Sequence, residues 1–218
     1  MPQDKLQQAS GEPFYWNQLS QLPPDDVCRR TGATYSPSWK GFLLSVYQLR
    51  YLVIPEARKI LRMEQNDQAI EEDLHPYFTL MVLVYLTGAK TIPLEGKWVS
   101  EKDLKGGFDF FQGPHGLRVR ELENMYGKDG ETFLKAGRRL GGKEISYGNK
   151  AFVLDVFPRI PLTYLLWEGN EEFPPKIRVL FDSTIQSHLP LDIIWGMVAE
   201  TSRRLAEQPV KKVKKVDS

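Results

Sequence analysis

The stretch FDSTIQSHLPLD, residues 181–192, contains the side-chain types of a nucleophile, a general base and an acid that orients the base. A working Ser-His-Asp triad requires its members within hydrogen-bond reach. If residues 182–188 are helical, Asp182 and His188 lie roughly 120° apart around the axis and about 9 Å apart along it. If they are extended, the separation is about 20 Å. Only an irregular turn could therefore make a triad from this stretch.

The same stretch also fits the end of a strand followed by the start of a helix. Asp182 would close the strand and cap a turn, and Pro190 suits the first position of a helix. Asp192 would lie in the first turn, where the helix macrodipole favours an acid. We therefore predict a strand end and a helix start here, and keep Asp182 and His188 as candidate ligand-binding residues.

The segment GRRLGGKE, residues 137–144, has the glycine and lysine spacing of a phosphate-binding loop. Its last position should be Ser or Thr to hold magnesium, but it is Glu144, which would repel phosphate. The segment also follows a helix-like pattern and leads toward a strand, which reverses the order of a P-loop. We predict a glycine helix stop rather than a nucleotide site.

The histidines and the cysteine give no metal signature. His75, His115 and His188 are 40 and 73 residues apart, which is not a metal-ligand spacing. His75 precedes Pro76 and suits a helix N-cap. Cys28 is the only cysteine, which excludes an intrachain disulfide and a cluster held by several thiolates of this chain. We expect no metal site, and the sequence does not identify a cofactor.

The least ordinary segment is KGGFDFFQGPHG, residues 105–116, where three phenylalanines accompany four glycines and a proline. We predict an irregular, mobile loop whose Phe110, Phe111 and His115 form a lid or a ligand platform. The alternative is that the phenylalanines close the edge of the core. Arg159 is the candidate for an anionic group of the ligand, because its planar fork suits a carboxylate or phosphate, and Trp167 lies farther along the same predicted strand.

Periodicity and turn residues define the elements that must position these side chains. A hairpin turning at Tyr47 and Gln48 is followed by an all-round apolar helix over Pro76–Leu86. The remaining elements are predicted strands over 150–157, 160–167 and 176–182, and helices over 22–33, 118–127, 129–142 and 189–207. We predict an α+β fold, with an antiparallel or mixed sheet, a buried central helix and a C-terminal helix packed on it.

Composition limits the domain organisation and the partners. With 41% apolar and 26% charged residues the chain should fold as one soluble domain, which we place at 14–207 between a flexible N-terminus (1–13) and a basic disordered tail (208–218). Residues 1–210 carry 25 basic and 27 acidic groups, so we expect no nucleic-acid partner. The longest uncharged apolar run, 77–89, is too short to span a membrane, and the N-terminus lacks a secretory signal. We expect a cytoplasmic protein.

Several short segments of the sequence together resemble those of a known family. They are RRTGA, FFQGPHG, GGK, FPRIPLTYLLWEGNEEFPP and LFDSTIQSHLPLDIIW. The chain resembles the uncharacterised family called domain of unknown function 3786, over roughly residues 14–206. The resemblance implies anaerobic metabolism, because members come mostly from anaerobic microbes. Some members carry an N-terminal iron–sulfur domain similar to that of the corrinoid iron–sulfur protein of one-carbon metabolism, which implies an iron–sulfur or corrinoid protein partner. This chain, with Cys28 alone, lacks that domain.

Three functional hypotheses follow. The first is a small-molecule or cofactor-binding accessory protein that uses Phe110, Phe111 and His115 beside the strand of Arg159 and Trp167. The second is a hydrolase or transferase with His115 or His188 as general base and Asp182 or Asp155 as its orienter. The third is an interaction module whose basic tail docks an acidic partner. An enzyme needs a base, an orienter and a polar cleft that converge, whereas a ligand platform needs an apolar pocket with few polar groups.

Overall fold

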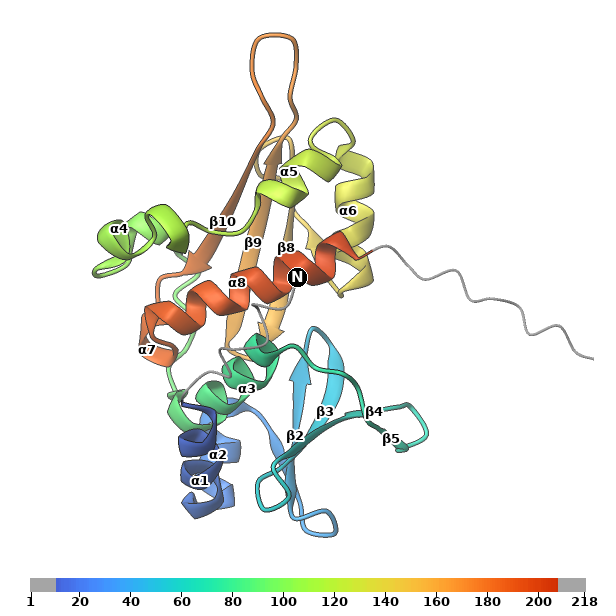
Figure 1. Cartoon of the computed structure of the whole chain (residues 1–218), viewed down its shortest axis with the longest axis vertical. Coiled ribbons are helices and arrows are strands. Elements are labelled where there is room, and N and C mark those ends of the chain that lie inside the picture. Colours follow the sequence, from blue (N-terminus) through green and yellow to red (C-terminus); the bar gives the residue numbers. More distant parts are fainter. Residues whose placement is uncertain (1–10, 208–218) are drawn as a thin grey trace, which may run out of the picture.

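Two antiparallel five-stranded sheets and the helices packed on them make up the α+β fold, which the computed structural model describes for residues 11–207 (Figure 1). The first sheet has the order β1-β2-β3-β4-β5, with strands Thr34–Ser36, Gly41–Val46, Leu49–Ile54, Lys59–Met63 and Ala69–Ile70. The second has the order β6-β10-β9-β8-β7, with strands Trp98–Val99, Lys176–Asp182, Ile160–Trp167, Lys150–Phe157 and Lys143–Glu144. The predicted fold class is confirmed, although the strands divide between two sheets.

The hairpin predicted at Tyr47 and Gln48 joins β2 to β3. Both residues have left-handed backbones, with φ of 51° and 63°, as a two-residue hairpin turn of type I′ requires. Neither residue is glycine or asparagine, the usual choices for these positions. Tyr47 is buried and its hydroxyl lies 2.9 Å from the Thr201 hydroxyl, so core packing holds this turn in place of favourable turn residues.

The second sheet is built on the meander β8–β9–β10, which matches the three predicted strands. Helix α8 (Leu191–Ala206) packs across this sheet, and Figure 1 shows it crossing β9. The Tyr164 hydroxyl of β9 contacts the Ser202 hydroxyl of α8 at 3.4 Å. Helices α5 (Arg120–Tyr126) and α6 (Gly130–Arg139) cover β10 and β8.

Helix α3 (Pro76–Gly88) is the buried central helix that the sequence predicts. His75 caps it, since its Nδ1 accepts a hydrogen bond from the Tyr77 amide at 3.2 Å. Helix α3 lies antiparallel to α8, because Tyr77 lies beside Gly196 and Gly88 lies beside the carbonyl of His188. The two helices therefore bury one common core against both sheets.

Other predictions need correction. Residues 105–116 were expected to lack regular structure, but they form helix α4 (Gly107–Phe110) and the 3-10 turn η2 (Gly113–His115), after a capped 3-10 turn η1 (Glu101–Asp103). Helix α1 (Glu12–Gln21) had no prediction and begins inside the range expected to be flexible. The short helices α2 (Pro24–Thr31) and α7 (Ile185–His188) complete the fold.

The termini bear on two of the predictions. The expected basic tail, 208–218, lies outside the described residues, as do residues 1–10. Between residues 11 and 207, no helix combines the length and the apolar character needed to cross a membrane.

Candidate ligand-binding pocket

A pocket of about 410 Å³ opens where the start of α3, the first turns of α8 and residues 110–118 meet. Leu80, Met81 and Ile193 give it an apolar floor. Four aromatic side chains form its walls: Tyr77, Phe110, His115 and Trp195. The structure thus places two of the predicted ligand-binding residues, Phe110 and His115, at one pocket.

The four aromatic rings contact one another in a continuous chain. Phe110 stacks on His115, with centroids 4.8 Å apart and planes 20° apart. His115 meets Trp195 edge to face at 6.0 Å, and Tyr77 does the same at 5.4 Å. Edge-to-face and offset stacks are the favourable aromatic geometries, so these rings hold one another in fixed orientations.

The segment that carries Phe110 and His115 is anchored to the rest of the fold. Gly106 takes a left-handed φ of 75° to start α4, and a Cβ on Gly107 would lie 2.0 Å from the Glu101 carbonyl oxygen, so only glycine fits there. The Lys105 backbone exchanges two hydrogen bonds with the Gln186 side chain, at 2.6 and 3.0 Å. The segment predicted to be a mobile loop is therefore anchored by these contacts and lines one side of the pocket.

Two opposite charges also line the pocket. The Arg118 guanidinium lies over the Trp195 ring, with its carbon 5.3 Å from the ring centroid. Asp192 belongs to the first turn of α8, three residues before Trp195 and on the same side of the helix. In the part of the chain that the structure describes, neither side chain forms a salt bridge or a hydrogen bond.

Phe111 lies next to the pocket without lining it. Its ring meets Phe110 edge to face at 5.0 Å and packs, half-buried, against the hydrophobic core. The sequence left open whether the phenylalanines form a platform or close the edge of the core. Phe110 lies at the pocket, Phe111 closes the core edge, and Phe108 is exposed.

Arg159 lies elsewhere and binds backbone carbonyls. Its Nε donates to the carbonyl oxygen of Arg30 at 2.6 Å, and Nη2 donates to that of Arg29 at 3.2 Å. The guanidinium therefore donates the hydrogen bonds that these two carbonyl groups in the last turn of helix α2 need. Trp167 lies at the opposite end of β9, where Arg178 approaches its ring at 5.9 Å. The structure does not bring these two residues to the pocket or to each other.

Asp182 and His188 both hold the segment that leads from α3 to β6. Asp182 accepts hydrogen bonds from the Gly96 amide at 2.8 Å and the Thr184 hydroxyl at 2.6 Å. Burial alone would raise the pKa of Asp182, but these bonds outweigh it and hold that pKa below its ordinary value. His188 Nδ1 accepts from the Lys90 amide at 3.2 Å. Between residues 11 and 207 no hydrogen bond joins Asp182 to His188, so this stretch forms no triad.

The His188 ring is buried, which favours its neutral form. Burial lowers its pKa, and the positive charges of Arg159 and Lys90 lower it further. Because Nδ1 is an acceptor, the proton of the neutral ring lies on Nε2. That atom has no hydrogen-bond partner among the described residues. A buried, uncompensated donor of this kind lowers stability, and it makes His188 poorly suited as a solvent-facing base.

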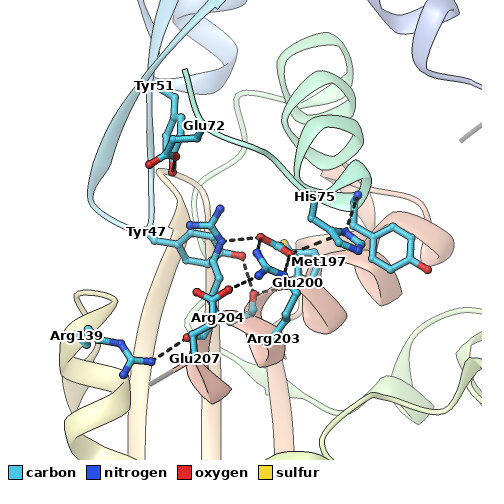
Figure 2. A network of polar contacts seen from close by, with 12 residues as sticks. Tyr47, Tyr51, Glu72, His75, Arg139, Met197, Glu200, Arg203, Arg204 and Glu207 are labelled. Carbon is cyan, nitrogen blue, oxygen red and sulfur yellow. Dashed lines mark hydrogen bonds and ion pairs between the residues drawn. The ribbon is translucent and has the colours of Figure 1, made fainter. Parts of the chain in front are cut away.

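A buried charge network lies farther along α8, and Figure 2 shows Arg203 and Arg204 reaching Glu200. Glu200 is 1% exposed and accepts from Arg203 Nε at 2.8 Å and from Arg204 Nε at 2.6 Å. The Arg204 guanidinium also lies 5.2 Å from the Tyr47 ring centroid and 4.6 Å from that of Phe78. The network ties α8 to the β2–β3 hairpin and to α3, and the two guanidiniums donate three hydrogen bonds to its carboxylate.

The residues of α8 that line the pocket were not predicted as site residues from the sequence. Asp192, Trp195 and Gly196 recur at the i, i+3, i+4 spacing, so they share one face of the helix. A glycine in the middle of a strongly predicted helix leaves a gap on that face. That combination of a charge, an indole and a gap is the pattern in the sequence that could have indicated a site.

Within residues 11–207, no group of three or more histidine, cysteine, aspartate or glutamate side chains is placed to hold a metal ion.

Comparison with known proteins identifies a family but not a function. No curated protein and no solved structure matches the chain. The pattern of a domain of unknown function, DUF3786, matches residues 23–204, which confirms the predicted resemblance. The chain therefore belongs to the DUF3786 family.

Proposed function

We propose that this protein binds a small molecule containing a flat ring, and that the pocket between α3, α8 and residues 110–118 is its site. The observation that carries the proposal is the wall of four mutually packed aromatic rings around an apolar floor. Aromatic faces attract flat rings through offset and edge-to-face contacts of about 0.5–1.5 kcal/mol per pair, in addition to burial.

The dimensions of the pocket support a ligand of one or two rings. Its volume of about 410 Å³ lies within the range of small-molecule sites, roughly 300–1,000 Å³. A corrinoid has a far larger macrocycle and would extend well outside the pocket. Two predictions from the family resemblance stay predictions: a role in anaerobic or one-carbon metabolism, and an iron–sulfur or corrinoid protein partner. Both concern the metabolism in which the ligand would be used.

The alternative of a hydrolase or transferase has less support. His115 is the histidine at the pocket, and no acidic side chain of residues 11–207 forms a hydrogen bond with it. Asp155, the other predicted orienter, does not line the pocket. It lies on β8, with its Oδ2 3.7 Å from Lys143 Nζ. A general base without an orienter is a weak catalyst, whereas a binding site needs no such partner.

The test combines native mass spectrometry of the protein purified without oxygen with a thermal-shift screen of flat ring compounds such as indole and quinoline. A bound mass or a compound that raises the Tm is expected. Phe110→Ala should abolish the shift, while Phe108→Ala, on the same short helix but 61% exposed, should leave it unchanged. If no ring compound raises the Tm, or if both variants respond alike, the proposal fails.

A further inference from the structure

The charges at the pocket narrow the chemistry of the ligand, an inference that rests on the proposed function. Arg118 and Asp192 both line the pocket and flank Trp195. Arg118 lies over the indole ring, and Asp192 precedes it by about one helical turn on α8. A ligand ring that packs against Trp195 would therefore have a guanidinium and a carboxylate within reach of its substituents.

Neither charge is neutralised by an ion pair among residues 11–207, although Asp192 lies in the first turn of α8, where the helix macrodipole favours an acid. Five arginines elsewhere in the fold each have carboxylate or carbonyl partners: Arg30, Arg62, Arg159, Arg203 and Arg204. Arg118 and Asp192 are both exposed at the pocket. Arg118 and Asp192, in contrast, have no ion-pair partner within 4.0 Å in the described range 11–207, and they do not pair with each other. The cation–π contact with Trp195 draws the guanidinium to the indole face. Both groups remain available to a ligand.

We propose that the ligand is a zwitterion, with a carboxylate bound by Arg118 and an ammonium group bound by Asp192, as in an α-amino acid with a flat aromatic side chain. The planar guanidinium fork matches a carboxylate with two parallel hydrogen bonds. The Asp192 carboxylate accepts the hydrogen bonds of an ammonium group. A ligand with only one of these charges would satisfy one side chain and be repelled by the other.

Isothermal titration calorimetry with four probes tests this assignment. L-phenylalanine carries both charges, 3-phenylpropionate only the carboxylate, phenethylamine only the ammonium group, and benzyl alcohol neither. We expect the amino acid to bind at least about tenfold more tightly than each of the others, which is the factor that one charge-assisted hydrogen bond contributes. A single-charge or uncharged probe that binds as tightly as the amino acid overturns the inference.

Two charge-removing variants assign the two contacts. Arg118→Gln should weaken phenylalanine binding about tenfold and leave phenethylamine unaffected or tighter. Asp192→Asn should weaken phenylalanine equally and leave 3-phenylpropionate unaffected or tighter. Arg120→Gln removes an exposed neighbouring charge that does not line the pocket, and it should change nothing.

The outcomes separate this inference from the proposed function. If no ring compound binds, the pocket proposal itself fails. If all four probes bind equally and Phe110→Ala removes that binding, the pocket is correct and the zwitterion is wrong. If Arg118→Gln and Asp192→Asn lower the Tm non-additively and leave every affinity unchanged, the two side chains pair only with each other, which also refutes the inference.

Discussion

Trp195 donates a hydrogen bond from its indole Nε1 to the Gly116 carbonyl oxygen, at 3.2 Å. Gly116 directly follows the 3-10 turn η2, which ends at His115. This bond therefore fixes the pocket wall to helix α8. Indole nitrogen is a donor only, so no other orientation of the ring could replace the contact.

The first prediction removes this bond and keeps an aromatic ring. Trp195→Phe should lower the free energy of unfolding by about 0.5–1.5 kcal/mol through the lost hydrogen bond, and somewhat more through lost packing. It should also weaken the binding of ring compounds. Urea unfolding and calorimetry measure the two effects. Trp39→Phe, at an exposed turn, is the control, and an equal response of both variants would contradict the assigned role of Trp195.

The second prediction separates binding from stability at Gly196. The three atoms nearest to a Cβ at this position would all belong to the Tyr77 side chain, at 3.7–3.9 Å, which is ordinary van der Waals contact. Gly196→Ala should therefore raise the free energy of unfolding by about 0.5–1 kcal/mol, because alanine is the better residue inside a helix. The added methyl group projects toward the pocket wall and should weaken ligand binding.

The matched control for Gly196 is Gly137, a glycine of helix α6. A Cβ there would lie 2.6 Å from the Phe152 ring, so something must shift to accept it. Gly137→Ala should destabilise the protein without a specific effect on the pocket. If Gly196→Ala destabilises like Gly137→Ala, the gap beside Tyr77 is smaller than the structure indicates.

The third prediction concerns the pH dependence that arises from His188. Its pKa is lowered in the folded protein, whereas in the unfolded chain it is about 6.5. Below about pH 6.5 the unfolded chain therefore binds a proton that the folded protein does not, and stability falls as the pH falls toward the lowered folded value. The groups that act on the ring are Arg159, Lys90 and Asp182.

His188→Asn should remove this contribution. Asparagine keeps an acceptor for the Lys90 amide and has no proton to gain in this range. Urea unfolding of both proteins between pH 7.5 and 5 should show the wild type losing stability relative to the variant as the pH falls. Two parallel curves would mean that His188 is protonated equally in the folded and unfolded states.

Local patterns predicted the elements well because their determinants are local. The all-round apolar run with His75 and Pro76 before it could only be a buried helix, and α3 begins at that proline. Glycine and aromatic content directed attention to residues 105–116, and Phe110 and His115 do line a pocket. The expected irregular loop was wrong because short 3-10 and α turns accept the glycines at their ends.

The rest of the site depends on pairings that no local pattern encodes. Tyr77 and Trp195 meet because α3 and α8 lie antiparallel, and they are far apart in the sequence. Arg159 directly precedes β9 and Trp167 is its last residue, so eight steps of about 3.3 Å separate them by roughly 25 Å. That distance follows from the sequence alone and argues against placing both residues in one site.

The last prediction concerns Glu200, the buried carboxylate between Arg203 and Arg204. Removing one member of a buried ion pair leaves the other charge without compensation, at a cost of about 3–5 kcal/mol. Arg204 is 13% exposed and stacks on Tyr47, so it cannot regain water without disturbing the β2–β3 hairpin. Glu200→Ala should therefore lower the free energy of unfolding by several kcal/mol, which urea unfolding measures.

The control is Glu207→Ala, which removes an exposed partner of Arg203 and should cost about 1 kcal/mol or less. Similar losses for the two variants would mean that water compensates Arg204, and that the network contributes little to holding the hairpin against α8.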